Sequence, residues 1–160
     1  MEKLNVGCGC NILEGWTNVD LYYKNPNIIN LDLLNLPDEW KDKYDEILCR
    51  HVLEHIPYNK LDQAFSTLHH ILKPGGKCVI SVPDMDYYTE LFYSCKDATL
   101  LKGWAFKCIF GTQEHEGEFH KSGFTETTFK HHLTKAGFTI NLFIAAWGAD
   151  QKTFVAECTK

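Results

Sequence analysis

Short apolar runs rich in β-branched residues alternate with stretches of helical periodicity, and this alternation constrains the fold more than any other feature of the sequence. The candidate strands are Lys3–Val6, Thr17–Asp20, Ile28–Leu31, Asp45–Cys49, Lys77–Val82, Phe138–Ala145 and Thr153–Cys158. Such an order is typical of α/β domains, in which helices cover a parallel sheet. A chain of 160 residues buries most of its apolar surface in one core, so we expect one domain over residues 1–160.

Two of the expected helices carry clear start and stop signals. Asn59 is the expected N-cap of the first helix, and Lys73–Gly76 (KPGG) ends that helix and turns the chain into the next strand. Thr125 is the expected N-cap of a later helix, which Gly137 closes. Both helices follow the rule that short polar residues cap the start and glycine ends the last turn.

A third helix and an irregular stretch lie between these two helices. Asp84 is placed to cap a helix over Met85–Cys95, which has apolar residues on one face. Residues 97–124 are less regular than the rest of the chain. We expect this segment to lie over the ligand site as a partial lid.

Composition and charge disfavour several classes of protein. The net charge of −5 comes without a basic stripe, so no nucleic-acid partner is expected. No apolar run approaches the roughly 20 residues that cross a bilayer, and the first strand begins too early for a signal peptide, so we expect no membrane association. The seven cysteines are an odd number, and several lie in strand-like runs, which favours a reducing, cytoplasmic setting.

The residues that follow the first strands are the first candidates for a ligand site, because open parallel sheets bind ligands at the carboxyl ends of their strands. Gly7–Cys8–Gly9 follows the first strand, and glycine there lets the backbone turn tightly and approach a ligand. Alone, this turn is equally typical of an ordinary strand end. The second strand ends in Asp20, which can accept both ribose hydroxyls, and the third runs into Asp32. Two such carboxylates favour a ligand site over two solvated strand ends.

With the fourth strand added, the chain resembles class I S-adenosylmethionine-dependent methyltransferases, especially their type 11 group. The segments that carry the resemblance occur in the family's order and cover nearly the whole chain: Asn5–Gly9 (NVGCG), Gly15–Asp20 (GWTNVD), Tyr44–Pro57, Leu72–Gly76 (LKPGG), Ile80–Asp84 and Gly123–Phe138. The resemblance implies a Rossmann-like three-layer α/β sandwich with a mostly parallel central sheet and an antiparallel last strand.

The resemblance also implies S-adenosyl-L-methionine as cofactor and S-adenosyl-L-homocysteine as product. The resemblance implies Gly7, Cys8 and Gly9 at the methionine portion, Asp20 at the ribose, Asp32 and Leu33 at the adenine, and Arg50 and His51 at the sulfonium. Leu21 is a further implied cofactor-binding residue. One departure is the short link between Gly9 and Asp20, because a crossover with its helix usually needs at least ~10–12 residues. We therefore expect no full helix there and a more open methionine end.

Methyl transfer requires alignment of the acceptor and, for a neutral oxygen or nitrogen acceptor, removal of a proton. Histidine has the best-matched pKa for that task. His120 is the preferred general base or orienting group, followed by His115 and Glu116, which lie in the same loop rich in titratable residues. Asp84 is a further candidate, although capping is its more ordinary role. No CxxC or HExxH spacing occurs, so no metal is expected.

The expected function is methyl transfer to an oxygen or nitrogen of a small-molecule acceptor, because the chain has no separate recognition domain. One alternative is a catalytically weak or inactive protein of the same fold that binds the cofactor and regulates a partner. Another is a nicotinamide dehydrogenase, which the missing third glycine after Gly7–Cys8–Gly9 disfavours. The sequence leaves the acceptor and the oligomeric state open.

Overall fold

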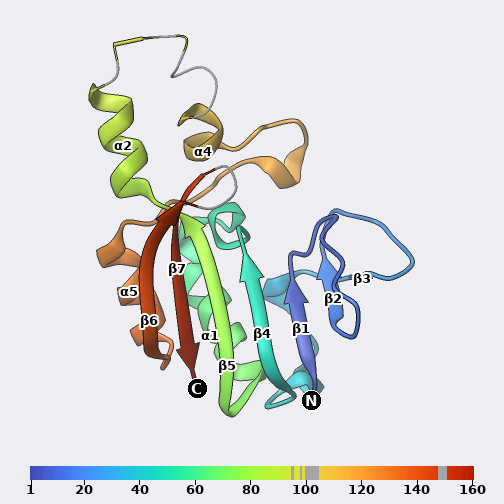
Figure 1. The fold of residues 1–160 in the computed structure, drawn as a ribbon. Helices are drawn as coiled ribbons and strands as arrows, with labels where there is room; N and C mark the ends of the chain where they lie inside the picture. The colour runs from blue at the N-terminus through green and yellow to red at the C-terminus, as the bar shows by residue number, and fades with distance from the viewer. Residues whose placement is uncertain (95, 98, 100–104, 148–150) are drawn as a thin grey trace.

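The computed structural model describes residues 1–94, 96–97, 99, 105–147 and 151–160, and these form a seven-stranded sheet in the order β3-β2-β1-β4-β5-β7-β6 (Figure 1). The strands are β1 (Lys3–Val6), β2 (Thr17–Asp20), β3 (Ile29–Asn30), β4 (Tyr44–Arg50), β5 (Leu72–Pro83), β6 (Thr139–Trp147) and β7 (Lys152–Thr159). β1 to β5 pair in parallel, whereas β7 pairs antiparallel with both β5 and β6. The predicted fold class, a mostly parallel sheet with an antiparallel last strand, is confirmed.

Two helices lie behind the sheet in Figure 1 and bury one of its faces: α1 (Leu61–Ile71) and α5 (Glu126–Lys135). Their buried residues recur at helical spacing, as Ala64, Phe65 and Leu68 do in α1. The ring centroids of Phe65 and Phe129 lie 6.1 Å apart, which joins the two helices over the core. Alternate strand residues, including the fully buried Cys49, Cys78 and Cys158, face these helices as small hydrophobes.

The opposite face of the sheet is covered over β1 and β2 by residues 10–16, which contain no helix, as the short link predicts. Two asparagines on that face hold the loop. Asn5 Nδ2 donates to the Asn11 carbonyl at 2.9 Å and to Asn18 Oδ1 at 3.0 Å, and Asn18 Nδ2 donates to the Leu13 carbonyl at 2.9 Å. Further along this face, the β6 residues Leu142 and Ile144 are 45% and 42% exposed.

The cap of α1 differs from the prediction. Asn59 lies inside the single-turn 3-10 helix η4 (Tyr58–Lys60), so the prediction that it caps α1 is wrong. The N-cap of α1 is Lys60, which makes no side-chain capping bond. The helix does end where expected, but β5 begins at once, because Leu72 already pairs with Tyr44 before an irregularity in the register.

The other two predicted helices, α5 and α2, agree with the start signals in the sequence. Thr125 Oγ1 accepts the Thr128 amide at 3.2 Å, and Gly137 has a φ of +98° after the last turn of α5. α2 (Met85–Ser94) starts directly after Asp84, whose Oδ1 accepts the Tyr87 amide at 2.9 Å. Cys95, the predicted last residue of this helix, lies outside the described residues. None of the described helices is long and apolar enough to cross a bilayer.

The described part of segment 97–124 contains α4 (Phe106–Phe110) and the 3-10 helix η6 (Glu116–Glu118). Gly111, directly after α4, and Phe119, directly after η6, form an isolated antiparallel bridge. Gly111 has a φ of +81°, and a Cβ there would lie 1.7 Å from the Glu118 carbonyl oxygen, so only glycine fits. Residues 98 and 100–104 of the predicted lid lie outside the described residues, and the lid stays a prediction.

Candidate functional site

The turn after β1 combines one glycine fixed by packing with one that faces open space. Gly7 and Gly9 have φ values of +61° and +50°. A Cβ on Gly7 would lie 2.2 Å from Val52 Cγ2, whereas a Cβ on Gly9 would meet no atom within 4 Å. The intervening Cys8 amide donates to the Val19 carbonyl at 3.0 Å, and burial raises the pKa of the Cys8 thiol to about 11. Cys8 is therefore a protonated packing residue, and the space beside Gly9 is open to a ligand.

The Asp20 carboxylate fastens this turn to the loop after β2. Its Oδ2 accepts the Gly9 amide at 2.8 Å, and its Oδ1 accepts the amides of Tyr22 and Tyr23 at 2.8 and 2.7 Å. Oδ1 accepts two amides and uses both of its lone pairs, whereas Oδ2 keeps one, so Asp20 retains the capacity to accept one ribose hydroxyl through Oδ2. Leu21 and both tyrosines are exposed beside it. The cofactor roles of Asp20 and Leu21 stay predictions that this geometry fits.

Asp32 and Leu33 lie at the next strand end, where the chain enters the 3-10 helix η1 (Leu33–Asn35). Asp32 caps η1, because its Oδ1 accepts the Leu34 amide at 2.9 Å and its Oδ2 accepts Asn35 Nδ2 at 3.1 Å. The Leu33 side chain is buried in the core, so only its backbone is left to face a nucleoside. Their predicted contacts with adenine remain untested.

A pocket of about 810 Å³ opens at the carboxyl ends of β4 and β5, next to the glycine turn. Because Val6 of β1 pairs with Cys49 of β4, the Gly7–Gly9 turn and Arg50 emerge at neighbouring strand ends. The wall is formed by the segment after β4, by parts of segment 107–120, and by the facing ends of β6 and β7. In Figure 1 the strand tips lie below α4, whose Lys107 and Cys108 also line the pocket.

Three imidazoles and one carboxylate meet in the pocket wall. His51, with a φ of +52°, places its Nδ1 3.1 Å from Glu54 Oε1. Glu54 belongs to the 3-10 helix η3 (Leu53–His55) and is 1% exposed. The His55 and His120 rings pack edge to face with centroids 4.8 Å apart. Burial is the main cause that lowers the pKa of His120, and the nearby Glu54 carboxylate opposes this shift.

The predicted catalytic residues separate into one that lines this pocket and three that do not. His120 lines the pocket. His115 Nδ1 accepts the Gly117 amide at 3.1 Å and caps η6, while Glu116 forms an exposed ion pair with Lys121 at 2.8 Å. Asp84 is buried as the cap of α2. Of the predicted sulfonium-facing residues, both Arg50 and His51 line the pocket.

Sequence reasoning missed most of the other residues in the wall, among them the polar residues Glu54, His55, Ser81 and Gln151. The sequence signal for Glu54 and His55 is their position shortly after His51, at the carboxyl end of a strand. Gln151 Nε2 lies 3.1 Å from His51 Nδ1, and no local pattern reveals a contact between residues so distant in sequence. The wall therefore depends on tertiary pairing more than on motifs.

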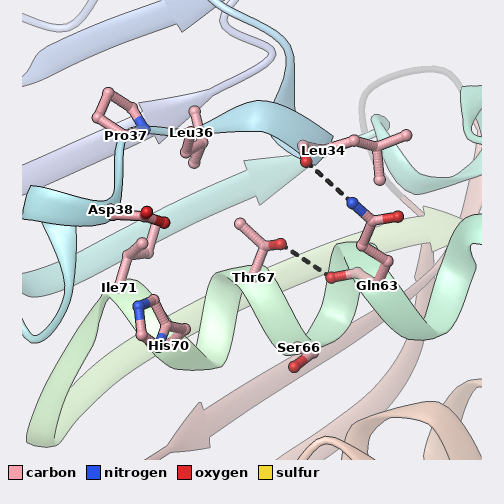
Figure 2. Close-up of a pocket in the computed structure, with 9 residues that line it drawn as sticks. All are labelled: Leu34, Leu36, Pro37, Asp38, Gln63, Ser66, Thr67, His70 and Ile71. Carbon is pink, nitrogen blue, oxygen red and sulfur yellow. Dashed lines mark hydrogen bonds between the residues drawn. The ribbon is translucent and has the colours of Figure 1, made fainter.

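A second, smaller hollow of about 270 Å³ lies between residues 34–38 and α1 (Figure 2). Gln63 Nε2 donates to the Leu34 carbonyl at 3.0 Å across this hollow, and Thr67 Oγ1 donates to the Gln63 carbonyl at 2.9 Å. His70 is the one imidazole in its described wall. The larger pocket, with its acid–imidazole cluster, is therefore the better candidate for chemistry.

Comparison with known proteins agrees with the fold. The family described as a methyltransferase domain matches residues 4–142. A methyltransferase of Methanosarcina mazei described as SAM-dependent has a TM-score of 0.70 at 16% identity, over 99% of this chain and 92% of that one. None of the curated proteins matches the chain.

Two further similar structures contain bound S-adenosylhomocysteine. The 1,6-didemethyltoxoflavin-N1-methyltransferase of Burkholderia thailandensis has a TM-score of 0.66 at 18% identity, over 99% of this chain and 70% of that one. The magnesium protoporphyrin IX methyltransferase of Synechocystis PCC 6803 has a TM-score of 0.67 at 16% identity, over 100% of this chain and 74% of that one. At these identities the likeness shows a shared fold.

Proposed function

This chain belongs to the methyltransferase-domain family, and we propose that it moves a methyl group from S-adenosyl-L-methionine to an oxygen or nitrogen of a small-molecule acceptor in the 810 Å³ pocket. Membership confirms the family that the sequence resembles, together with its reaction class and cofactor. The acceptor class and the roles of individual residues are our proposal.

The observation that carries the proposal is the adjacency of two features at neighbouring strand ends. The open space beside Gly9 lies at the tip of β1, in a turn that the Asp20 carboxylate holds through the Gly9 amide. The pocket begins at Arg50 and His51, at the tip of β4, the strand next to β1. A positively charged donor and a neutral acceptor can therefore be held side by side without a further domain.

The residues at the glycine turn fit the cofactor. A ligand can approach the backbone at Gly9 because no side chain fills the space there, and the Asp20 carboxylate is positioned by three amides. S-adenosyl-L-methionine supplies a methyl group already activated by a positive sulfur. The protein's task is then chiefly alignment and exclusion of water, and good alignment can lower a barrier by ~7–11 kcal/mol.

His120 is the residue we propose to hold or accept the acceptor's proton. Its Nδ1 lies 3.0 Å from the Cys108 carbonyl oxygen, which can only accept a hydrogen bond. Nδ1 therefore carries the proton, and Nε2 is the free lone pair. Because burial lowers the pKa of His120, the imidazole is neutral at pH 7 and able to act as a base.

The size and lining of the pocket favour a small, partly apolar acceptor. Its volume of about 810 Å³ falls within the ~300–1,000 Å³ typical of small-molecule sites. Trp147 and Val155 supply apolar surface, whereas Arg50, Lys107 and Glu118 supply charge. The toxoflavin and porphyrin methyltransferases with this fold also take small molecules by their names, which supports an acceptor of that class.

Calorimetry followed by a product assay tests the proposal. We expect S-adenosylmethionine and S-adenosylhomocysteine to bind the purified chain, and mass spectrometry to detect S-adenosylhomocysteine release with at least one class in a panel of phenols, carboxylic acids and amines. His120→Asn should reduce release, whereas Glu116→Gln, which changes an exposed ion pair, should not. Absence of binding at millimolar concentration contradicts the proposal, and binding without turnover favours a regulatory role.

A further inference from the structure

We propose that Glu54, His55 and His120 form a binding site for one divalent transition-metal ion, with Zn²⁺ as the best fit, in the wall of the acceptor pocket. Their ligand-capable atoms all lie within 4.8 Å of one another. A tetrahedral Zn²⁺ site with ligand bonds of ~2.0–2.2 Å needs ligand separations of about 3.5 Å. Small side-chain adjustments therefore suffice to close the three groups around an ion.

Glu54 provides an independent sign of a missing partner. Glu54 is 1% exposed, and its Oε2 has no hydrogen-bond partner among the described residues. The other oxygen, Oε1, lies 3.1 Å from His51 Nδ1. A buried carboxylate oxygen without a partner is costly, whereas a bound cation would satisfy both its lone pairs and its charge.

Both imidazoles are held in the tautomer that a metal requires. His55 Nδ1 lies 3.2 Å from the Phe119 carbonyl oxygen, and His120 Nδ1 lies 3.0 Å from the Cys108 carbonyl oxygen. Carbonyl oxygens only accept, so both Nδ1 atoms donate and both Nε2 atoms keep their lone pairs. Metal-binding histidines are commonly anchored through their second nitrogen in this way.

The backbone brings these ligands together without the ion. The Lys121 and Ser122 amides donate to the Glu54 carbonyl at 2.8 and 3.0 Å, and Ser122 Oγ donates to the Leu53 carbonyl at 3.0 Å. These bonds tie the segment that carries His120 to η3, which carries the other two ligands. The site is thus positioned by rigid backbone contacts, as a binding site requires.

The donor set selects the ion and suggests its task. Two imidazole nitrogens and one carboxylate oxygen suit Zn²⁺ and its transition-metal neighbours, whereas Mg²⁺ and Ca²⁺ prefer oxygen ligands. Three protein ligands leave a coordination position open, and all three residues line the pocket. If the proposed function holds, that position takes the acceptor's hydroxyl oxygen and lowers its pKa, with the proton released to water. With the ion bound, the Nε2 atom of His120 holds the ion and orients the acceptor through it; without the ion, the same Nε2 atom is available as the base of the proposed function.

The sequence contained no recognised metal spacing, which is why no metal was expected from it. Two ligands are adjacent, Glu54 and His55, and the third, His120, comes from a segment far along the chain. Cys8 and Cys10, which lie close together in the sequence, are not in this cluster. The site becomes visible when the fold joins the two segments.

Metal binding to the chelator-stripped chain, measured without cofactor or acceptor, tests the site separately from the proposed function. Calorimetry should show one Zn²⁺ per chain and no binding of Mg²⁺, and Co²⁺ should give the visible absorption of a four-coordinate nitrogen–oxygen site. Glu54→Gln and His120→Asn should each weaken Zn²⁺ binding by about 100-fold or more, since even a change in a group that only hydrogen-bonds to a metal ligand costs ~10–100-fold. His131→Asn, an exposed histidine on α5, is the matched control and should bind as the original chain does.

Circular dichroism melts confirm that each variant is folded, and His55→Gln replaces either variant that is not. Failure of the original chain to bind Zn²⁺ at millimolar concentration overturns the site, as does equal binding by the ligand variants. If Zn²⁺ binds but leaves the rate of S-adenosylhomocysteine release from hydroxyl acceptors unchanged, the orienting role is overturned. If the original chain binds Zn²⁺ but transfers no methyl group to any acceptor tested, the result counts against the proposed function and not against the metal site.

Discussion

Replacing Gly7 with alanine should destabilise the fold by an amount that can be worked out from its surroundings. The left-handed φ of +61° costs a non-glycine residue ~1–2 kcal/mol. The new Cβ would lie 2.2 Å from Val52 Cγ2, far inside carbon–carbon contact, and such overpacking typically costs ~1–3 kcal/mol. We therefore expect the free energy of unfolding to fall by ~2–5 kcal/mol, a large part of the ~5–15 kcal/mol that holds a domain together.

Gly9→Ala is the matched control, because its φ is +50° and its Cβ would meet nothing within 4 Å. This variant should lose only the backbone contribution of ~1–2 kcal/mol in urea unfolding, but it should bind S-adenosylhomocysteine more weakly because the methyl group enters the open space. Combining Gly7→Ala with Val52→Ala should recover the overpacking cost in a double-mutant cycle. Equal destabilisation by the two alanines, or no coupling to Val52, would refute the reasoning.

Three further predictions concern single carboxylates and one histidine. Asp20→Ala removes the acceptor of three amides and should weaken S-adenosylhomocysteine binding by about 10-fold or more in calorimetry. The reason is that a hydrogen bond to a charged group contributes ~1.5–3 kcal/mol. Unchanged affinity would contradict the cofactor role of Asp20. Asp84→Ala removes the cap of α2 and should lower the free energy of unfolding by ~1 kcal/mol without changing cofactor affinity. A large loss of cofactor affinity would instead place the Asp84 carboxylate in the cofactor site. Burial lowers the pKa of His69 below its usual 6.5, so the unfolded chain binds more protons near that pH, and stability should fall as the pH drops below about 6.5. Denaturation of His69→Gln between pH 7 and pH 5 should show a weaker dependence, and an identical slope would argue against this shift.

The fold was predictable where local signals agree with tertiary pairing. β1 and β2 have the predicted bounds, because Gly7 directly follows β1 and Gly15–Trp16 directly precedes β2, which ends at Asp20. Thr125 and Gly137 marked the ends of α5 for the same local reason. β5 began earlier than predicted because its first residue, Leu72, pairs across the sheet with Tyr44, and such a partner leaves no local mark.

The candidate site was predictable in part. The segment Arg50–His51 was found because it follows a strand at the ligand-binding edge, and it lines the pocket. Density of titratable residues was a poorer guide, since His115 and Glu116 make contacts within their own loop. Glu54 was missed because its importance depends on burial, and burial follows from the packing of the whole fold.

The position of β7 has a consequence for how the protein is made. The last strand in the sequence is an internal strand of the sheet, inserted between β5 and β6. During synthesis β6 emerges before β7, with which it pairs, so the edge of β5 and the edge of β6 that β7 later covers stay unpaired until β7 follows. Because Thr153 and Val155 of β7 also line the pocket, a nascent chain that lacks them has an incomplete acceptor site. Catalysis should therefore begin only once synthesis has passed β7, and premature termination in that strand should yield an aggregation-prone and inactive product.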